Sequence, residues 1–177
     1  MSLRRLPVLL SIATLTLAVA PAAHAEIFVT IKGQKQGLIK GDSLVKGHEG
    51  QIVATSFDYD VKSPRDPATG LATGKRQHSP ITLRINSSAT SVHLFQALVT
   101  NENLTSVVIE FWAASDVGGL LPQKRVTLTN ASLSDLHQRA NAAKATWQDD
   151  VSIVFQKIEL LDVPTGASAV DSTTATP

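Results

Sequence analysis

The sequence predicts a mainly β protein: a β-barrel of two sheets with one flanking α-helix. Several segments alternate apolar and polar side chains, which is the pattern of a half-buried strand. One segment carries apolar residues at clear helical spacing, and it lies between two such strands in residues 79–112. Because the rest of the chain is strand-like, this helix has only sheet to pack against. We expect it to cover one face or one open end of the sheet.

Alternation predicts strands along the whole chain. They cover residues 26–32, 50–61, 81–85, 107–111, 125–133 and 151–160. Six or more short strands at this spacing favour a barrel or a sandwich. Residues 133–144 fit either a short helix or a loop.

The central helix is predicted from apolar residues that would share one stripe. They are Val92, Phe95, Leu98 and Val99. Ser87 or Ser88 is expected to cap its start, because a serine oxygen can accept a hydrogen bond from an unpaired N–H of the first turn. Asn101 is expected to end it, because Asn tolerates the left-handed conformation that closes a helix.

Residues 50–61 form the clearest strand. Val53, Phe57 and Tyr59 fall on one side of it, whereas Asp58 and Asp60 fall on the other. A one-residue slip would bury the aspartates, so the register is well specified, with the side of Phe57 facing the core.

Residues 1–25 have the three regions of a secretory signal peptide. Two arginines precede an apolar stretch, and Ala23-His24-Ala25 supplies small residues at the two positions that a signal peptidase reads. Cleavage after Ala25 would leave 152 residues, 26–177. The alternative is a retained membrane anchor, although the apolar stretch is short for a span, which needs about twenty residues. Residues 26–163 would form one barrel domain, and residues 164–177 a disordered tail rich in Ala, Ser and Thr.

Charge and composition exclude several classes of partner and site. The chain has 16 basic and 15 acidic residues, and removing Arg4 and Arg5 with the signal leaves 14 against 15. A nearly neutral chain gives no reason to expect nucleic acid or a membrane surface as partner. The chain has no cysteine, which excludes disulfides and thiolate metal sites.

No motif supports catalysis or a cofactor. Residues 70–76 resemble a phosphate-binding loop, but three residues rather than four separate the glycines, and Arg76 replaces the hydroxyl residue. Asp58 and Asp60 share a strand face and could perform acid–base chemistry or bind a divalent ion. We favour the alternative, the polar side of a half-exposed strand. No two histidines have the spacing of a zinc pair. We therefore expect a protein that is not an enzyme, with no catalytic, cofactor-binding or metal-binding residues.

Residues 62–79 are predicted to form a long charged loop with little that could be buried. Loops beyond about twelve residues are usually functional or disordered. We interpret this loop as a surface for a partner. Its candidate contact residues are Arg65, Asp66, Lys75, Arg76 and His78.

Several segments together resemble one known family. They are Phe28–Gly33 with Gln36–Ile39, Gly47–Glu49, Ser63–His78, Leu94–Asn103, Thr127–Ala131 and Phe155–Glu159. The sequence resembles the haemolysin-coregulated protein (Hcp) family, the tube protein of type VI secretion systems, over residues 27–159. The segment from Ser63 to His78 is the most specific, because no generic β fold demands its composition.

The resemblance implies a β-barrel with the helix packed alongside, in homohexameric rings that stack into a tube. It also implies effectors in the lumen, and contacts with spike or sheath proteins. The loop would then reach a neighbouring subunit, in its own ring or the next.

The signal peptide departs from the family pattern, because these tube proteins are assembled in the cytoplasm and leave through the secretion machine. If the signal is processed, the protein is secreted or periplasmic. If it is not, the protein is cytoplasmic and then secreted as a tube subunit. The alternative function is an exported periplasmic or extracellular binding module with an Hcp-like fold.

Overall fold

The computed structural model describes residues 25–115 and 118–173, so the predicted signal peptide lies outside the described residues except for Ala25. The elements are β1 (Ala25–Gly33), β2 (Gly37–Ile39), β3 (Ile52–Asp58), β4 (Val61–Lys62), β5 (Gln77–His78), β6 (Ile81–Asn86), α1 (Ala89–Val99), β7 (Leu104–Ala114), β8 (Leu120–Asn141), the 3-10 turn η1 (Ala142–Lys144), β9 (Thr146–Asp162) and β10 (Ser168–Ser172). Within these residues no helix is long and apolar enough to cross a bilayer.

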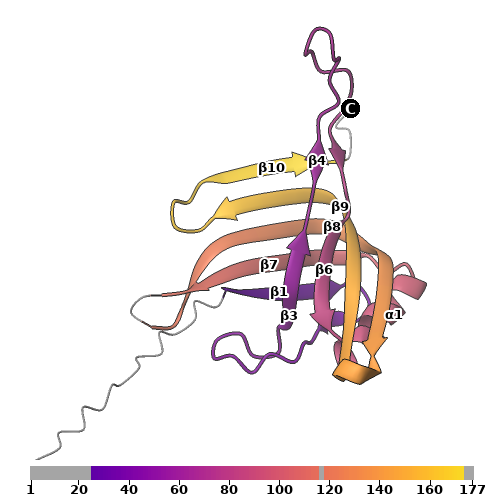
Figure 1. Cartoon of the computed structure of the whole chain (residues 1–177), viewed down its shortest axis with the longest axis vertical. Helices are drawn as coiled ribbons and strands as arrows, with labels where there is room; N and C mark the ends of the chain where they lie inside the picture. The colour runs from indigo at the N-terminus through magenta and orange to yellow at the C-terminus, as the bar shows by residue number, and fades with distance from the viewer. Residues whose placement is uncertain (1–24, 116–117, 174–177) are drawn as a thin grey trace, which may run out of the picture.

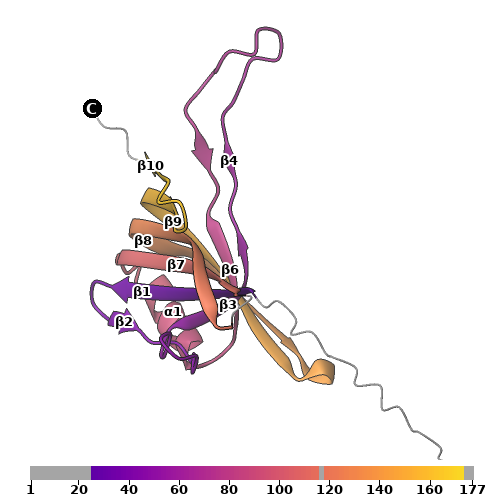
Figure 2. The same cartoon turned by 90° about the vertical axis from the view of Figure 1, so that its left-hand side faces the viewer.

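The sheet closes on itself. Hydrogen bonds connect the strands in the order β9-β6-β3-β1-β7-β8, and β8 pairs with β9 again, all antiparallel. The wall of the barrel is therefore one continuous sheet, to which β2 and β10 add short strands on β1 and β9 (Figure 2). The predicted mainly β barrel with a single helix is confirmed.

The core is filled by every second residue of the wall strands, as the alternation predicts. On β6 the side chains of Ile81, Leu83 and Ile85 are fully buried. The neighbouring strands add further buried residues: Val29, Ile31, Val107, Ile109, Val126, Leu128, Val151 and Ile153. One apolar cluster thus joins strands that are far apart in the sequence.

Strand β3 changes its inward side partway along, which corrects the predicted register. Ala54 faces Ile85 on β6, and Ser56 faces the next residue, Arg84, so Thr55 is an extra residue on β3. Before this bulge the inward side chains are Ile52 and Ala54. After it Phe57 turns inward. A bulge shifts the alternation by one residue, and uninterrupted alternation cannot reveal it.

Helix α1 has the predicted ends but a different buried face. Ser88 caps it in a reciprocal pair with Ser91, and Asn101 has φ = 48°. The buried residues are Thr90, Ser91, Leu94 and Ala97. The predicted stripe is wrong for three of its four residues, because Val92, Phe95 and Val99 are 68%, 53% and 53% exposed. The fourth, Leu98, packs against the core. The small side chains of the buried face allow a close approach, and the Thr90 hydroxyl donates to the Lys40 carbonyl at 2.9 Å.

Strands β8 and β9 form a long hairpin that settles residues 133–144. The sequence predicts either a short helix or a loop for these residues. In the structure β8 continues to Asn141, and only the turn η1 follows. Its pairing with β9 extends from Lys124–Asp162 to Asn141–Thr146. The end of this hairpin projects beyond the barrel (Figure 2). Pairing with a partner strand, rather than local apolar pattern, makes this segment extended.

The predicted disordered tail is also partly corrected. Residues 168–172 form β10, which pairs with β9 from Ser168–Leu161 to Ser172–Lys157. Residues 174–177 lie outside the described residues. Backbone pairing explains the order here, since the segment has few apolar side chains to bury.

A buried carboxylate joins the β1–β2 turn to the end of α1. Glu102 is 2% exposed, and its carboxylate accepts hydrogen bonds from the N–H groups of Lys35 and Gln36 at 2.7 and 2.8 Å. The Gln36 amide donates to the same carboxylate at 2.8 Å and to the His93 carbonyl at 3.1 Å. A Cβ at Gly33 would lie 2.4 Å from Glu102 Oε1, so this turn needs glycine there.

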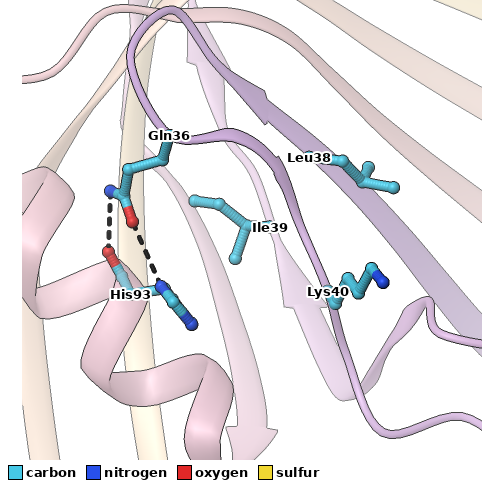
Figure 3. A pocket seen from close by; sticks show the side chains of 5 residues that line it. All are labelled: Gln36, Leu38, Ile39, Lys40 and His93. Carbon is cyan, nitrogen blue, oxygen red and sulfur yellow. Dashed lines mark hydrogen bonds between the residues drawn. The ribbon is translucent and has the colours of Figure 1, made fainter.

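Figure 3 shows a pocket of about 350 Å³ beside this junction, lined by Gln36, Leu38, Ile39, Lys40 and His93. The polar groups of Gln36 and His93 already bind each other across it. The pocket is thus the contact region between the β1–β2 turn and α1.

Glu102→Gln is expected to lower the free energy of unfolding by about 1–3 kcal/mol at neutral pH, because it removes the buried negative charge and replaces Oε2, the acceptor of the Gln36 amide, with a donor. Burial alone would raise the pKa of Glu102, but the hydrogen bonds from Gln36 and Lys35 hold it below its ordinary value. A depressed folded pKa stabilises the fold above the unfolded pKa of about 4.3, and that contribution is lost as pH falls through the folded value.

Chemical denaturation from neutral pH to pH 3 should therefore show the gap between wild type and Glu102→Gln closing as the solution becomes acidic. Asp135→Asn, which alters an exposed carboxylate, is the control and should change little. A gap that stays constant across this range would contradict the role of the carboxylate charge.

Candidate functional site: the projecting arm

The chain leaves the barrel between β3 and β6 and returns as a projecting arm, defined here as residues 61–78 (Figures 1 and 2). The predicted loop is closed at its base by a short two-stranded sheet, in which Val61 pairs with His78 and Lys62 with Gln77. Its ends are tied by Ser79 N–H to the Asp60 carbonyl at 2.9 Å and by Asp60 N–H to Ser79 Oγ at 2.9 Å. The arm is therefore a hydrogen-bonded element with closed ends.

Two of the predicted contact residues shape the tip of the arm. Asp66 Oδ1 accepts from the N–H groups of Ala68 and Thr69 at 2.9 and 2.7 Å, and the bonds from Thr69 lower the pKa of Asp66. Arg65 pairs with Ala72 in an isolated bridge, and its guanidinium donates to the Gly70 carbonyl at 3.1 Å. These side chains form the turn itself.

Two other predicted residues meet at the base of the arm, against strand β10. Arg76 donates two hydrogen bonds to the Asp171 carboxylate, both at 2.6 Å. His78 Nε2 lies 3.2 Å from Asp171 Oδ2, and its Nδ1 lies 2.6 Å from the Tyr59 hydroxyl. A neutral imidazole that donates through Nε2 and accepts at Nδ1 satisfies both contacts. The His78 side chain is only 9% exposed and packs edge-on against Phe155 at 5.7 Å.

Electrostatics at this base are consistent with an ionised aspartate. The hydrogen bonds from Arg76 hold the pKa of Asp171 below its ordinary value, outweighing the effect of burial. Burial, reinforced by the negative charges of Asp171 and Asp60, raises the pKa of Tyr59, so its hydroxyl keeps its proton. A protonated tyrosine can donate to His78 Nδ1, as the pairing above requires.

The five predicted contact residues thus separate into a tip pair and a base pair, with Lys75 exposed between them. Sequence reasoning missed Tyr59 and Asp171. Asp171 is the one acidic residue in the Ala/Ser/Thr-rich tail, and Tyr59 is the one tyrosine of the chain. That each is the single residue of its kind, in the tail or in the chain, is the signal that could have identified it.

The aspartates considered for chemistry do not form a site with a third ligand. Asp58 and Asp60 are both exposed, and Asp60 pairs with Lys62 at 3.0 Å. Within residues 25–115 and 118–173 no group of three His, Cys, Asp or Glu side chains could hold a metal ion.

Comparison with known proteins identifies the class to which this barrel, helix and arm belong. The family model described as "Type VI secretion system effector, Hcp" matches residues 28–161. A relative from Pseudomonas aeruginosa, "Major exported protein", is 30% identical over 159 residues, which cover 81% of this chain and 92% of that protein. The chain belongs to the Hcp family, the tube proteins of type VI secretion systems.

Solved structures agree with this assignment. A crystal structure of an Hcp protein superposes with a TM-score of 0.77 at 25% identity, covering 83% of this chain and 98% of that chain. The secreted protein Hcp3 from Pseudomonas aeruginosa superposes with a TM-score of 0.72 at 25% identity, covering 86% of this chain and all of that chain.

Asp58→Asn combined with Asp60→Asn is expected to leave the free energy of unfolding within about 0.5 kcal/mol of wild type, the usual range for surface substitutions. Thermal unfolding with and without millimolar Ca²⁺ or Mg²⁺ checks this, and the ions should not shift the wild-type midpoint. A cation-dependent stabilisation that the double variant loses would show that the pair binds metal.

Proposed function

We propose that this tube protein assembles as homohexameric rings that stack into a tube, and that the arm makes the contact between subunits. The observation that carries the proposal is the arm itself. It extends far beyond the barrel (Figure 2), and apart from His78 at its base it contributes no side chain to the apolar core. A projecting element of this kind is explained by a partner surface.

The closed wall favours this use of the arm. A barrel leaves no continuous strand edge for another subunit to extend, so contacts between copies must use side chains, short edges or projections. A ring also needs a head-to-tail contact, in which one surface of each copy meets a different surface of the next. The arm provides one such surface, with Leu71 and Lys75 exposed on it.

The same proposal extends to partners of the tube. We infer that effectors travel within the ring and that spike and sheath proteins meet its ends and outside. Membership of the family supports these inferences. The three exposed apolar residues of α1 offer a second surface for such contacts: Val92, Phe95 and Val99.

The family is one of exported proteins, and we further propose that residues 1–25 act as a signal peptide. Cleavage after Ala25 would remove only the first residue of β1, which leaves the pairing of Glu26 with Trp112 intact. The barrel can therefore fold with or without the preceding segment. Processing would place ring assembly outside the cytoplasm.

Replacing residues 64–75 with a short Gly-Ser linker is expected to keep the barrel folded and to weaken ring stacking and ring closure. The wall strands retain their core side chains, and Arg76 remains on the base. Circular dichroism and thermal unfolding test the fold, while light scattering and electron microscopy test assembly.

A matched control replaces only residues 67–69 with Gly-Ser-Gly, which alters the tip turn but keeps the length of the arm. Rings and tubes that form normally without residues 64–75 would show that the arm is not the contact. A collapsed dichroism spectrum would show that it belongs to the core.

The mature protein is expected to begin at Glu26 and to be found outside the cytoplasm. N-terminal sequencing of protein from periplasmic and extracellular fractions of the host checks this. An Ala23→Arg, Ala25→Arg variant, which lacks small residues at the cleavage positions, should accumulate unprocessed. Intact Met1 on wild-type protein in the cytosol would contradict cleavage after Ala25.

A further inference from the structure

The base of the arm lies in a gap in the pairing of β9. One edge of β9 pairs along its whole length with β8. On the other edge β6 pairs with residues 148–153 and β10 pairs with residues 157–161. Residues 154–156 lie between these two partners. Strand β5 precedes β6, so the arm leaves the barrel at this gap, and Figure 1 shows the end of β10 meeting it there.

Strand β10 closes the gap and holds the base of the arm. Thr173 N–H donates to the Gln156 carbonyl at 2.8 Å, and the Thr173 hydroxyl donates to the Phe155 carbonyl at 2.9 Å. From the same end of β10, Asp171 receives both Arg76 hydrogen bonds and lies against His78. His78 in turn contacts Tyr59, the residue that follows β3. One carboxylate therefore connects β10 to the returning side of the arm and, through His78, to Tyr59 just before the arm begins.

We propose that β10 is a brace that sets the direction of the arm, with Asp171, Arg76, His78 and Tyr59 as its positioning residues. A two-stranded ribbon is only marginally stable alone, and β4–β5 has two pairs of residues at its base. The Asp171 side chain on β10 restrains tilting of the arm, because it holds Arg76 at the base of the arm. The bidentate guanidinium–carboxylate geometry restrains orientation as well as distance.

Strand β10 lies beyond the residues that the family model matches. The family match ends at residue 161, whereas β10 begins at Ser168. Asp171 therefore lies outside the matched residues, while Arg76 and His78 lie within them. The importance of a fixed arm direction for assembly rests on the proposed function above. The restraint itself does not.

The test measures the direction of the arm directly. Because the chain has no cysteine, spin labels can be attached at Ala68→Cys on the tip and Asp135→Cys on the barrel. Pulsed electron spin resonance should give a narrow distance distribution in wild type and a broad one in Asp171→Ala and Arg76→Ala. Hydrogen exchange at the arm base should accelerate in these variants by roughly 5- to 30-fold, the effect of losing one modest interaction.

Controls separate a brace from general damage to β10. Val170→Ala alters an exposed side chain of the same strand and should keep the narrow distribution. Asp171→Glu should restore much of the restraint. Thermal unfolding should change little in every variant, because these side chains lie outside the apolar core.

A distribution that stays narrow in Asp171→Ala and Arg76→Ala would overturn the inference, as would broadening in Val170→Ala of the same size. Light scattering on the same samples judges the proposed function separately. A broad distribution with normal assembly supports the brace and contradicts the arm as the subunit contact. A broad distribution with weakened assembly supports both.

Discussion

The pairing of β8 with β9 is the interaction on which the rest of this structure depends. These strands share a ladder from Lys124–Asp162 to Asn141–Thr146, and it joins the two ends of an otherwise open sheet. Closure buries one side of every wall strand and removes the long edges that would otherwise be available to other chains. Strands β6 and β10 pair with the other edge of β9, and α1 packs beside the barrel.

Closure also determines what is left for contact with other molecules. The exposed features are projections and short edges: the arm, the end of the β8–β9 hairpin and the outward side of α1. An exported tube subunit without disulfides must hold its shape through its core and its neighbours. The buried Glu102 junction and the apolar cluster stabilise the core, and the projecting elements are available for contact with neighbours.

Much of the fold could be predicted from the sequence, because alternating side chains record which side of a strand is buried. Strand β6 and the two ends of α1 were accessible for that reason. The bulge at Thr55 was not, since Val53 and Phe57 also fit an uninterrupted alternation, so the sequence does not reveal the extra residue. The buried face of α1 was missed because its contacts are made by Thr90 and Ala97, while larger apolar residues face outward.

Backbone pairing with β9, which the side-chain pattern does not record, makes β10 and the end of β8 extended. At the site, the arm was recognisable from length and charge, but Asp171 lies 95 residues from Arg76 in sequence, and no local pattern connects them.

The tied ends of the arm have a consequence for how such a chain can change. Asp60 and Ser79 hold the two ends together through short hydrogen bonds, so the places of β3 and β6 in the barrel wall do not depend on the length of the tip. Doubling the length of a flexible loop between closed ends costs only about 0.6 kcal/mol of closure entropy. The tip is therefore a position where foreign peptides could be inserted for display on the outside of the barrel. Natural variation in arm length is expected to be similarly inexpensive, which would let one barrel serve assemblies of different spacing.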